Sequence, residues 1–209
     1  MSSGARPGRL ASLAFVLVAT AAPLATPLRA DDRAGGDATA RPASMFPKGT
    51  WDLALHGAYH QTEREGDETI ATATLSAGYY FGDRFSVRGE LVGYALDNQP
   101  GPSPADADDA VGLGVNAGLR YQFIEYQRLT LFAEVYTGVL YSHRDFPEDG
   151  THLNFTLQGG LGATFRLADD VHLFGGVRHL HISNARLRGE DENPSFDGPG
   201  AYVGLLFRF

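Results

Sequence analysis

Alternating apolar and polar residues dominate the chain after its first forty or so positions. The clearest case runs from Val111 to Phe123, where every second residue from Val111 onward is Val, Leu, Ala, Tyr or Phe. The residues between them are Gly, Asn, Arg and Gln. Successive side chains of a β-strand point to opposite faces, so this segment predicts a strand with one apolar and one polar face.

The same alternation occurs in seven further segments, and helical periodicity is nearly absent. Most of the eight segments reach the ~9–11 residues that a tilted strand needs to cross a bilayer. An even number of such strands is typical of a closed barrel in the bacterial outer membrane. The fold class predicted is all-β, an eight-stranded antiparallel transmembrane (outer-membrane) β-barrel, with strands at Thr50–His60, Glu68–Phe81, Arg84–Leu96, Val111–Phe123, Arg128–Ser142, His152–Leu167, Val171–Ser183 and Gly200–Phe209.

The connections between these segments alternate in length. Gly82-Asp83, Ile124–Gln127 and Ala168–Asp170 are short, and the others are longer and polar: Gln61–Asp67, Asp97–Asp109, His143–Thr151 and Asn184–Pro199. Outer-membrane barrels have short periplasmic turns and long external loops. Loop lengths and strand count therefore favour the same architecture.

A soluble eight-stranded barrel of the lipocalin type is the structural alternative, with its apolar face turned inward to a ligand. The polar faces here carry many glycines with scattered Arg, Gln and Asn, which suits a small lumen filled by side chains. Phe209, Phe207, Leu205 and Val203 share one phase and resemble the C-terminal signal that the barrel assembly machinery reads. Both features favour the membrane barrel.

The N-terminal region differs from the rest of the chain. Arg6 and Arg9 precede the apolar run Ala11–Ala22, and Pro23 and Ala30 follow it. This layout predicts a secretory signal peptide over residues 1–30, a flexible leader over 31–48 and the barrel over 49–209. The chain of 209 residues has no cysteine and a net charge of −8, which argues against nucleic acid as a partner.

The seventh segment carries the candidate chemistry. His181 and Ser183 lie two residues apart and in phase with Leu173 and Val177, so both are expected on the outer face. A base beside a hydroxyl makes a serine nucleophile, although an interfacial His and Ser also simply contact head groups and water. The candidate carboxylates for orienting the imidazole follow in the next loop: Glu190, Asp191, Glu192 and Asp197. A metal site at His179 and His181 is the weaker interpretation, since no third ligand is evident.

Arg178, the run His181-Ile182-Ser183-Asn184-Ala185 and the later Asn193-Pro194 resemble the signature of the lipid A 3-O-deacylases, the PagL-like acyloxyacyl hydrolases. The resemblance implies Ser183 as nucleophile, His181 as general base, Asn184 as an oxyanion contributor and a lipid-facing site. It places the acid at Asp197, where family enzymes carry Glu, and leaves Glu190 or Glu192 as alternatives. Arg178 falls in the lumen phase, which favours a structural role.

The resemblance implies an outer-membrane esterase that hydrolyses the 3-O-linked hydroxyacyl chain of lipid A, without a metal or other cofactor. Its partners would be lipid A or lipopolysaccharide, outer-membrane lipid and the assembly machinery, and a homodimer stays open. The alternative function is a non-enzymatic structural or adhesive barrel of the OmpA/OmpX type. A channel is disfavoured, because eight strands leave an interior filled by side chains.

Overall fold

The computed structural model describes residues 44–63, 68–97, 110–147, 150–187 and 194–209. The expected signal peptide over residues 1–30, and the expected leader up to residue 43, lie outside these described residues. Among the described residues no helix is long and apolar enough to cross a membrane.

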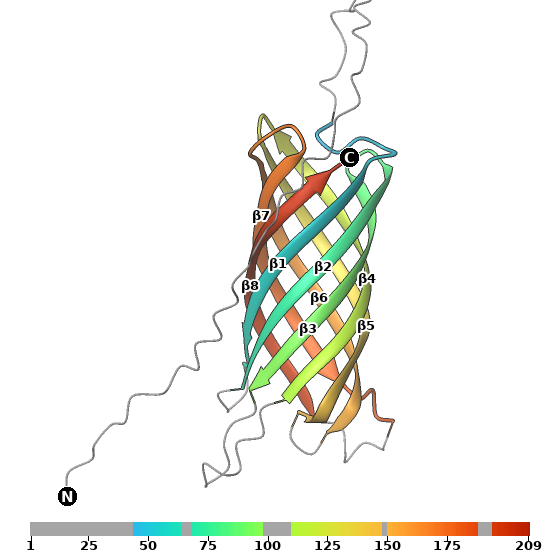
Figure 1. Ribbon diagram of the computed structural model, residues 1–209, viewed down its shortest axis with the longest axis vertical. Coiled ribbons are helices and arrows are strands. Elements are labelled where there is room, and N and C mark those ends of the chain that lie inside the picture. Colours follow the sequence, from blue (N-terminus) through green and yellow to red (C-terminus); the bar gives the residue numbers. More distant parts are fainter. Residues whose placement is uncertain (1–43, 64–67, 98–109, 148–149, 188–193) are drawn as a thin grey trace, which may run out of the picture. The chain divides into compact units, whose positions relative to one another are not determined.

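Eight antiparallel strands form a closed barrel, in which each strand pairs with its neighbours along the chain and β1 pairs with β8 (Figure 1). Exposed apolar side chains alternate along the strands with buried ones, so the outer surface is apolar and the lumen is filled. The prediction of an eight-stranded barrel is confirmed, with strands β1 (Trp51–Gln61), β2 (Thr69–Gly82), β3 (Phe85–Asp97), β4 (Ala110–Tyr126), β5 (Leu129–Phe146), β6 (Thr151–Arg166), β7 (Val171–Ser183) and β8 (Ser195–Arg208).

The last strand begins earlier than the sequence pattern predicts. β8 starts at Ser195 rather than Gly200, and its pairing with β7 continues through Gly198 and Pro199. The pairing of β8 with β1 begins only at Gly200, so Pro199 lies where β8 pairs with one neighbour. A proline, which has no N–H to donate, is tolerated at such an edge. The expected loop Asn184–Pro199 therefore shrinks to residues 184–194.

The barrel has a turn end, with the connections over residues 83–84, 127–128 and 167–170, and an opposite end, called the loop end, where β1, β3, β5 and β7 finish. One expected long loop is short, because β5 continues to Phe146 and leaves only residues 147–150 before β6. Phe146 is fully buried with its ring centroid 6.1 Å from that of Phe196, and its carbonyl accepts a 2.8 Å hydrogen bond from Asn154 Nδ2. These contacts extend the hairpin beyond Ser142.

The lumen is layered. A loop-end cluster of buried side chains contains Tyr94, Leu180, Ile182 and Phe196, and a turn-end cluster contains Phe132, Phe174 and Leu206. The turn-end cluster also includes Met45 and Phe46, which belong to the segment expected as leader. Phe46 stacks on Tyr80 at 5.1 Å, and the Met45 carbonyl accepts a 2.6 Å hydrogen bond from Arg208. Residues just before β1 therefore pack against this end of the barrel.

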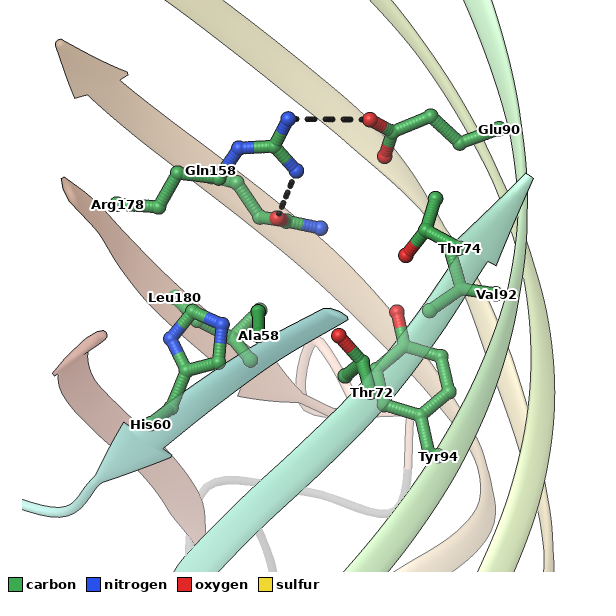
Figure 2. A pocket seen from close by; sticks show the side chains of 10 residues that line it. All are labelled: Ala58, His60, Thr72, Thr74, Glu90, Val92, Tyr94, Gln158, Arg178 and Leu180. Carbon is green, nitrogen blue, oxygen red and sulfur yellow. Dashed lines mark hydrogen bonds and ion pairs between the residues drawn. The ribbon is translucent and has the colours of Figure 1, made fainter. Parts of the chain in front are cut away.

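Between the two clusters lies a layer of buried charge centred on Glu134. Its carboxylate accepts hydrogen bonds from Arg120 Nη2 at 2.8 Å, Arg178 Nε at 2.8 Å and Tyr202 Oη at 2.6 Å. Arg178 also donates to Glu90 at 3.1 Å and to Gln158 at 3.2 Å, as Figure 2 shows. Every charge in this layer has an opposite partner, which is the condition under which buried charges persist.

A small cavity lies beside this layer, inside the barrel. His60, Tyr94, Arg178 and Leu180 are among the side chains that line it, and its volume is about 10 Å³ (Figure 2). This volume admits about one water molecule and no acyl chain. The lumen of the described barrel therefore offers no room for a lipid substrate at this place.

Replacing Glu134 should destabilise the barrel strongly, because Glu134→Ala leaves Arg120 and one contact of Arg178 buried without their carboxylate. We expect a loss of about 3–5 kcal/mol in the free energy of unfolding, measured by urea titration in detergent micelles.

The matched control is Asp170→Ala, which removes the ion pair of Asp170 with Arg208 at the turn end, where the Asp170 side chain is 60% exposed. An exposed pair should contribute less than about 1 kcal/mol. Equal losses for the two variants would show that the buried charge layer does not carry the barrel's stability.

Candidate active site

The candidate residues belong to two neighbouring strands, β7 and β8, and to the turn between them (Figure 1). His181 and Asp197 are partly exposed on the outer face, whereas Ser183 is only 8% exposed and Asn184 is buried. On β7, Val177 and His179 are exposed and His181 is partly exposed, while the intervening Leu180 and Ile182 are buried in the loop-end cluster. Alternation along the strand thus separates the interior packing from the outer polar group.

His181 bridges a hydroxyl and a carboxylate. Its Nδ1 lies 2.6 Å from Asp197 Oδ1, and its Nε2 lies 3.0 Å from Ser183 Oγ. A protonated Nδ1 donates to the carboxylate and leaves Nε2 as an acceptor for the Ser183 hydroxyl proton. This is the geometry that activates a serine as a nucleophile.

Strand register accounts for the contact between His181 and Asp197. The two residues are direct cross-strand partners, and Ser183 is likewise opposite Ser195. Directly opposed residues have Cβ atoms about 4.5–5.5 Å apart, so the short side chain of Asp reaches the imidazole. The expectation that the acid lies in a loop is wrong for Asp197, which is part of β8. Glu190, Asp191 and Glu192 lie outside the described residues.

Asn184 begins a tight turn directly after Ser183. Its side chain is buried, Oδ1 accepts a 2.9 Å hydrogen bond from the Arg186 N–H, and its carbonyl accepts one from Leu187 at 3.2 Å. Ala185 and Arg186 have φ of 52° and 61°, a left-handed backbone that costs about 1–2 kcal/mol per residue. The N–H groups of Arg186 and Leu187 therefore have partners within the turn, and the Asn184 side chain is the polar group fixed next to Ser183.

The side chains of Ser195 and His179 also lie close to the Asp197 carboxylate, and the sequence pattern predicted neither contact. The Ser195 hydroxyl donates to Oδ2 at 3.0 Å, and His179 Nε2 lies 3.9 Å from Oδ1. Continuing the two-residue period of β8 back past Pro199 would have placed Ser195 on the same face as Asp197. Within the described ranges, no group of three or more His, Cys, Asp or Glu side chains is arranged to hold a metal ion.

Apolar side chains surround this polar group on the outer surface. Phe155 and Leu157 of β6 are the cross-strand partners of Ser183 and His181, and they are 39% and 53% exposed. Val177 continues the same face of β7 toward the turn end and is 60% exposed. The hydroxyl, imidazole and carboxylate thus adjoin an apolar surface.

Comparison with known proteins gives a family match over most of the chain. The model of the family described as lipid A 3-O-deacylase (PagL) matches residues 43–205. No curated protein sequence matches the chain significantly.

Several solved outer-membrane barrels share the fold. OprG from Pseudomonas aeruginosa has a TM-score of 0.54 at 13% identity, over 79% of this chain and 99% of its own. Neisserial surface protein A has 0.54 at 14%, over 77% and 96%. The outer membrane enzyme PagL has 0.51 at 20%, over 75% and 98%. At these identities the structural likeness establishes the fold.

Proposed function

Because the chain belongs to the PagL family of lipid A 3-O-deacylases and folds as a barrel of the bacterial outer membrane, we propose that it is a serine esterase. Its reaction is hydrolysis of the 3-O-linked hydroxyacyl chain of lipid A, on the lipid-facing surface of β7 and β8. The observation that carries the proposal is the position of His181, within hydrogen-bond distance of both Ser183 and Asp197.

The reaction divides into two acyl transfers. Ser183 Oγ attacks the ester carbonyl carbon while His181 Nε2 takes the hydroxyl proton. The tetrahedral intermediate collapses, the sugar oxygen at position 3 departs, and His181 returns the proton to it. Water then attacks the acyl-enzyme with His181 again as the base, which releases the hydroxy fatty acid and restores the Ser183 hydroxyl.

Asp197 and Asn184 stabilise the charges that develop. The carboxylate of Asp197 holds the Nδ1–H tautomer of His181 and balances the imidazolium that forms in each step. Asn184 follows the nucleophile directly, and its side-chain amide is the donor assigned to the oxyanion. Low polarity around the site strengthens both interactions.

A lipid-facing site fits the surroundings of Ser183. Phe155 and Leu157 offer an apolar surface to an acyl chain, whereas the cavity in the lumen has a volume of only about 10 Å³. Lipid A would therefore approach sideways within the membrane rather than through the barrel. The assembly machinery as a partner and a homodimer stay predictions.

Removing the nucleophile should abolish deacylation. Ser183→Ala expressed in a Gram-negative host should leave lipid A fully acylated, whereas the unmodified protein removes one hydroxyacyl chain, as measured by mass spectrometry of extracted lipid A. Thr137→Val, which deletes an outer-surface hydroxyl on β5, is the control and should act like the unmodified protein.

Retained activity in Ser183→Ala would refute the serine mechanism. Unchanged lipid A with the unmodified protein, at verified outer-membrane expression, would instead favour the non-enzymatic barrel.

The identity of the acid can be tested separately. Asp197→Asn presents a donor to His181 Nδ1 and favours the wrong tautomer, so the rate should fall on the order of 10³–10⁴-fold. Glu190→Gln and Glu192→Gln should leave the rate within about 3-fold, since the proposal assigns neither carboxylate a part in the reaction. Rates are measured on purified lipid A in mixed micelles. A large loss in Glu190→Gln or Glu192→Gln with an active Asp197→Asn would reassign the acid.

A further inference from the structure

We propose that Ser195 is a positioning residue that holds the Asp197 carboxylate in line with His181, an inference that rests on the proposed function. Its hydroxyl donates at 3.0 Å to Oδ2, the oxygen that His181 does not contact. The two oxygens of Asp197 therefore have separate partners, and the carboxylate plane is fixed from both sides.

The backbone at Asp197 is held as well. Its carbonyl accepts a 2.9 Å hydrogen bond from the Glu63 N–H just beyond β1, and its Cα lies opposite that of His181 in the β7–β8 ladder. With the main chain fixed on both sides, the remaining freedom is rotation of the short side chain. A hydrogen bond from Ser195 to Oδ2 restricts that rotation.

The position of Ser195 follows from the same register that places the nucleophile. Ser195 is the cross-strand partner of Ser183, just as Asp197 is the partner of His181. Four residues on two strands therefore form two opposed pairs on one face. The Ser195 hydroxyl reaches the Asp197 carboxylate because Ser195 precedes Asp197 by two positions on β8, and this spacing puts both side chains on the same face of the strand.

His179 is the competing candidate for this role. Its Nε2 lies 3.9 Å from Asp197 Oδ1, the oxygen that already accepts from His181, and its side chain is 48% exposed. That distance exceeds hydrogen-bond length, and an exposed pair contributes little. The geometry therefore favours Ser195 over His179, because Ser195 contacts the second oxygen at hydrogen-bond distance and His179 does not.

The test compares Ser195→Thr with Ser195→Val, two variants of nearly the same shape that differ in the hydroxyl. Both are β-branched residues suited to a strand, so both should fold, as judged by heat-modifiable migration on gels. Ser195→Thr should keep kcat within about 3-fold, and Ser195→Val should lower it roughly 10-fold, the scale of one hydrogen bond to a charged acceptor. KM for lipid A should not change, since Ser195 is not assigned to substrate binding.

A double-mutant cycle distinguishes positioning from a general effect on the barrel. In an Asp197→Ala background, Ser195→Val should change the residual rate by less than about 2-fold, because its only target is gone. His179→Leu should cost less than Ser195→Val. Equal rates for the Thr and Val variants, additive losses in the cycle, or a larger loss in His179→Leu would each overturn the proposal.

Ser183→Ala is measured alongside to separate this proposal from the proposed function. If Ser183→Ala stays active, the serine mechanism itself fails. If Ser183→Ala is inactive while Ser195→Thr and Ser195→Val turn over equally, only the role of Ser195 fails.

Discussion

The closed ladder of backbone hydrogen bonds is the constraint on which the rest of this structure depends. Hydrocarbon offers no partner for a free N–H or carbonyl, so each strand must pair on both sides and β1 must meet β8. Once closed, the ladder fixes which residues face the membrane and which fill the lumen. It also fixes which residues lie opposite one another, and the candidate site is built from two such opposed pairs on β7 and β8.

The buried carboxylate of Glu134 and the surface carboxylate of Asp197 have different kinds of hydrogen-bond partner. The interior carboxylate Glu134 is fully enclosed and accepts hydrogen bonds from two arginines and two tyrosines. Asp197 is partly exposed on the outer surface, where the His181 imidazole lies within hydrogen-bond distance of Oδ1 and the Ser195 hydroxyl within hydrogen-bond distance of Oδ2. The first arrangement neutralises the carboxylate permanently, which suits a structural element. The second places the carboxylate beside a ring nitrogen of His181 and a hydroxyl, which is the arrangement that the proposed role of His181 requires.

Most of the fold could be predicted because the two faces of each strand lie in different environments, and this difference produces the alternation of apolar and polar residues in the sequence. The predicted strand boundaries are wrong where this alternation stops. Gly198, Pro199 and Gly200 have no alternating apolar pattern, so the start of β8 looked like a loop. Phe146 continues β5 through contacts with Phe196 that are distant in sequence. Both cases depend on tertiary pairing, which a local pattern does not contain.

The site was predictable to the extent that it follows strand phase. His181 and Ser183 share a face of one strand, and the sequence shows that spacing directly. The contact of Asp197 with His181 depends on the register between two strands, which one sequence does not specify. Ser195 was not predicted because the sequence pattern started β8 at Gly200. In the structure β8 begins at Ser195, which places the Ser195 hydroxyl beside the Asp197 carboxylate.

Arg178 and Leu180 are buried in the lumen, whereas His179 and His181 lie on the outer face of β7. This alternation limits which insertions and deletions β7 can accept. A single inserted or deleted residue in this part of β7 would turn the guanidinium out into lipid and bury the imidazole, so both stability and chemistry would be lost together. Length changes in the connection after Leu187 carry no such penalty for the contact of His181 with Asp197, because strand register, not the loop, brings the acid to the base. Related enzymes should therefore differ freely in that loop while conserving the parity of the strands on either side of it.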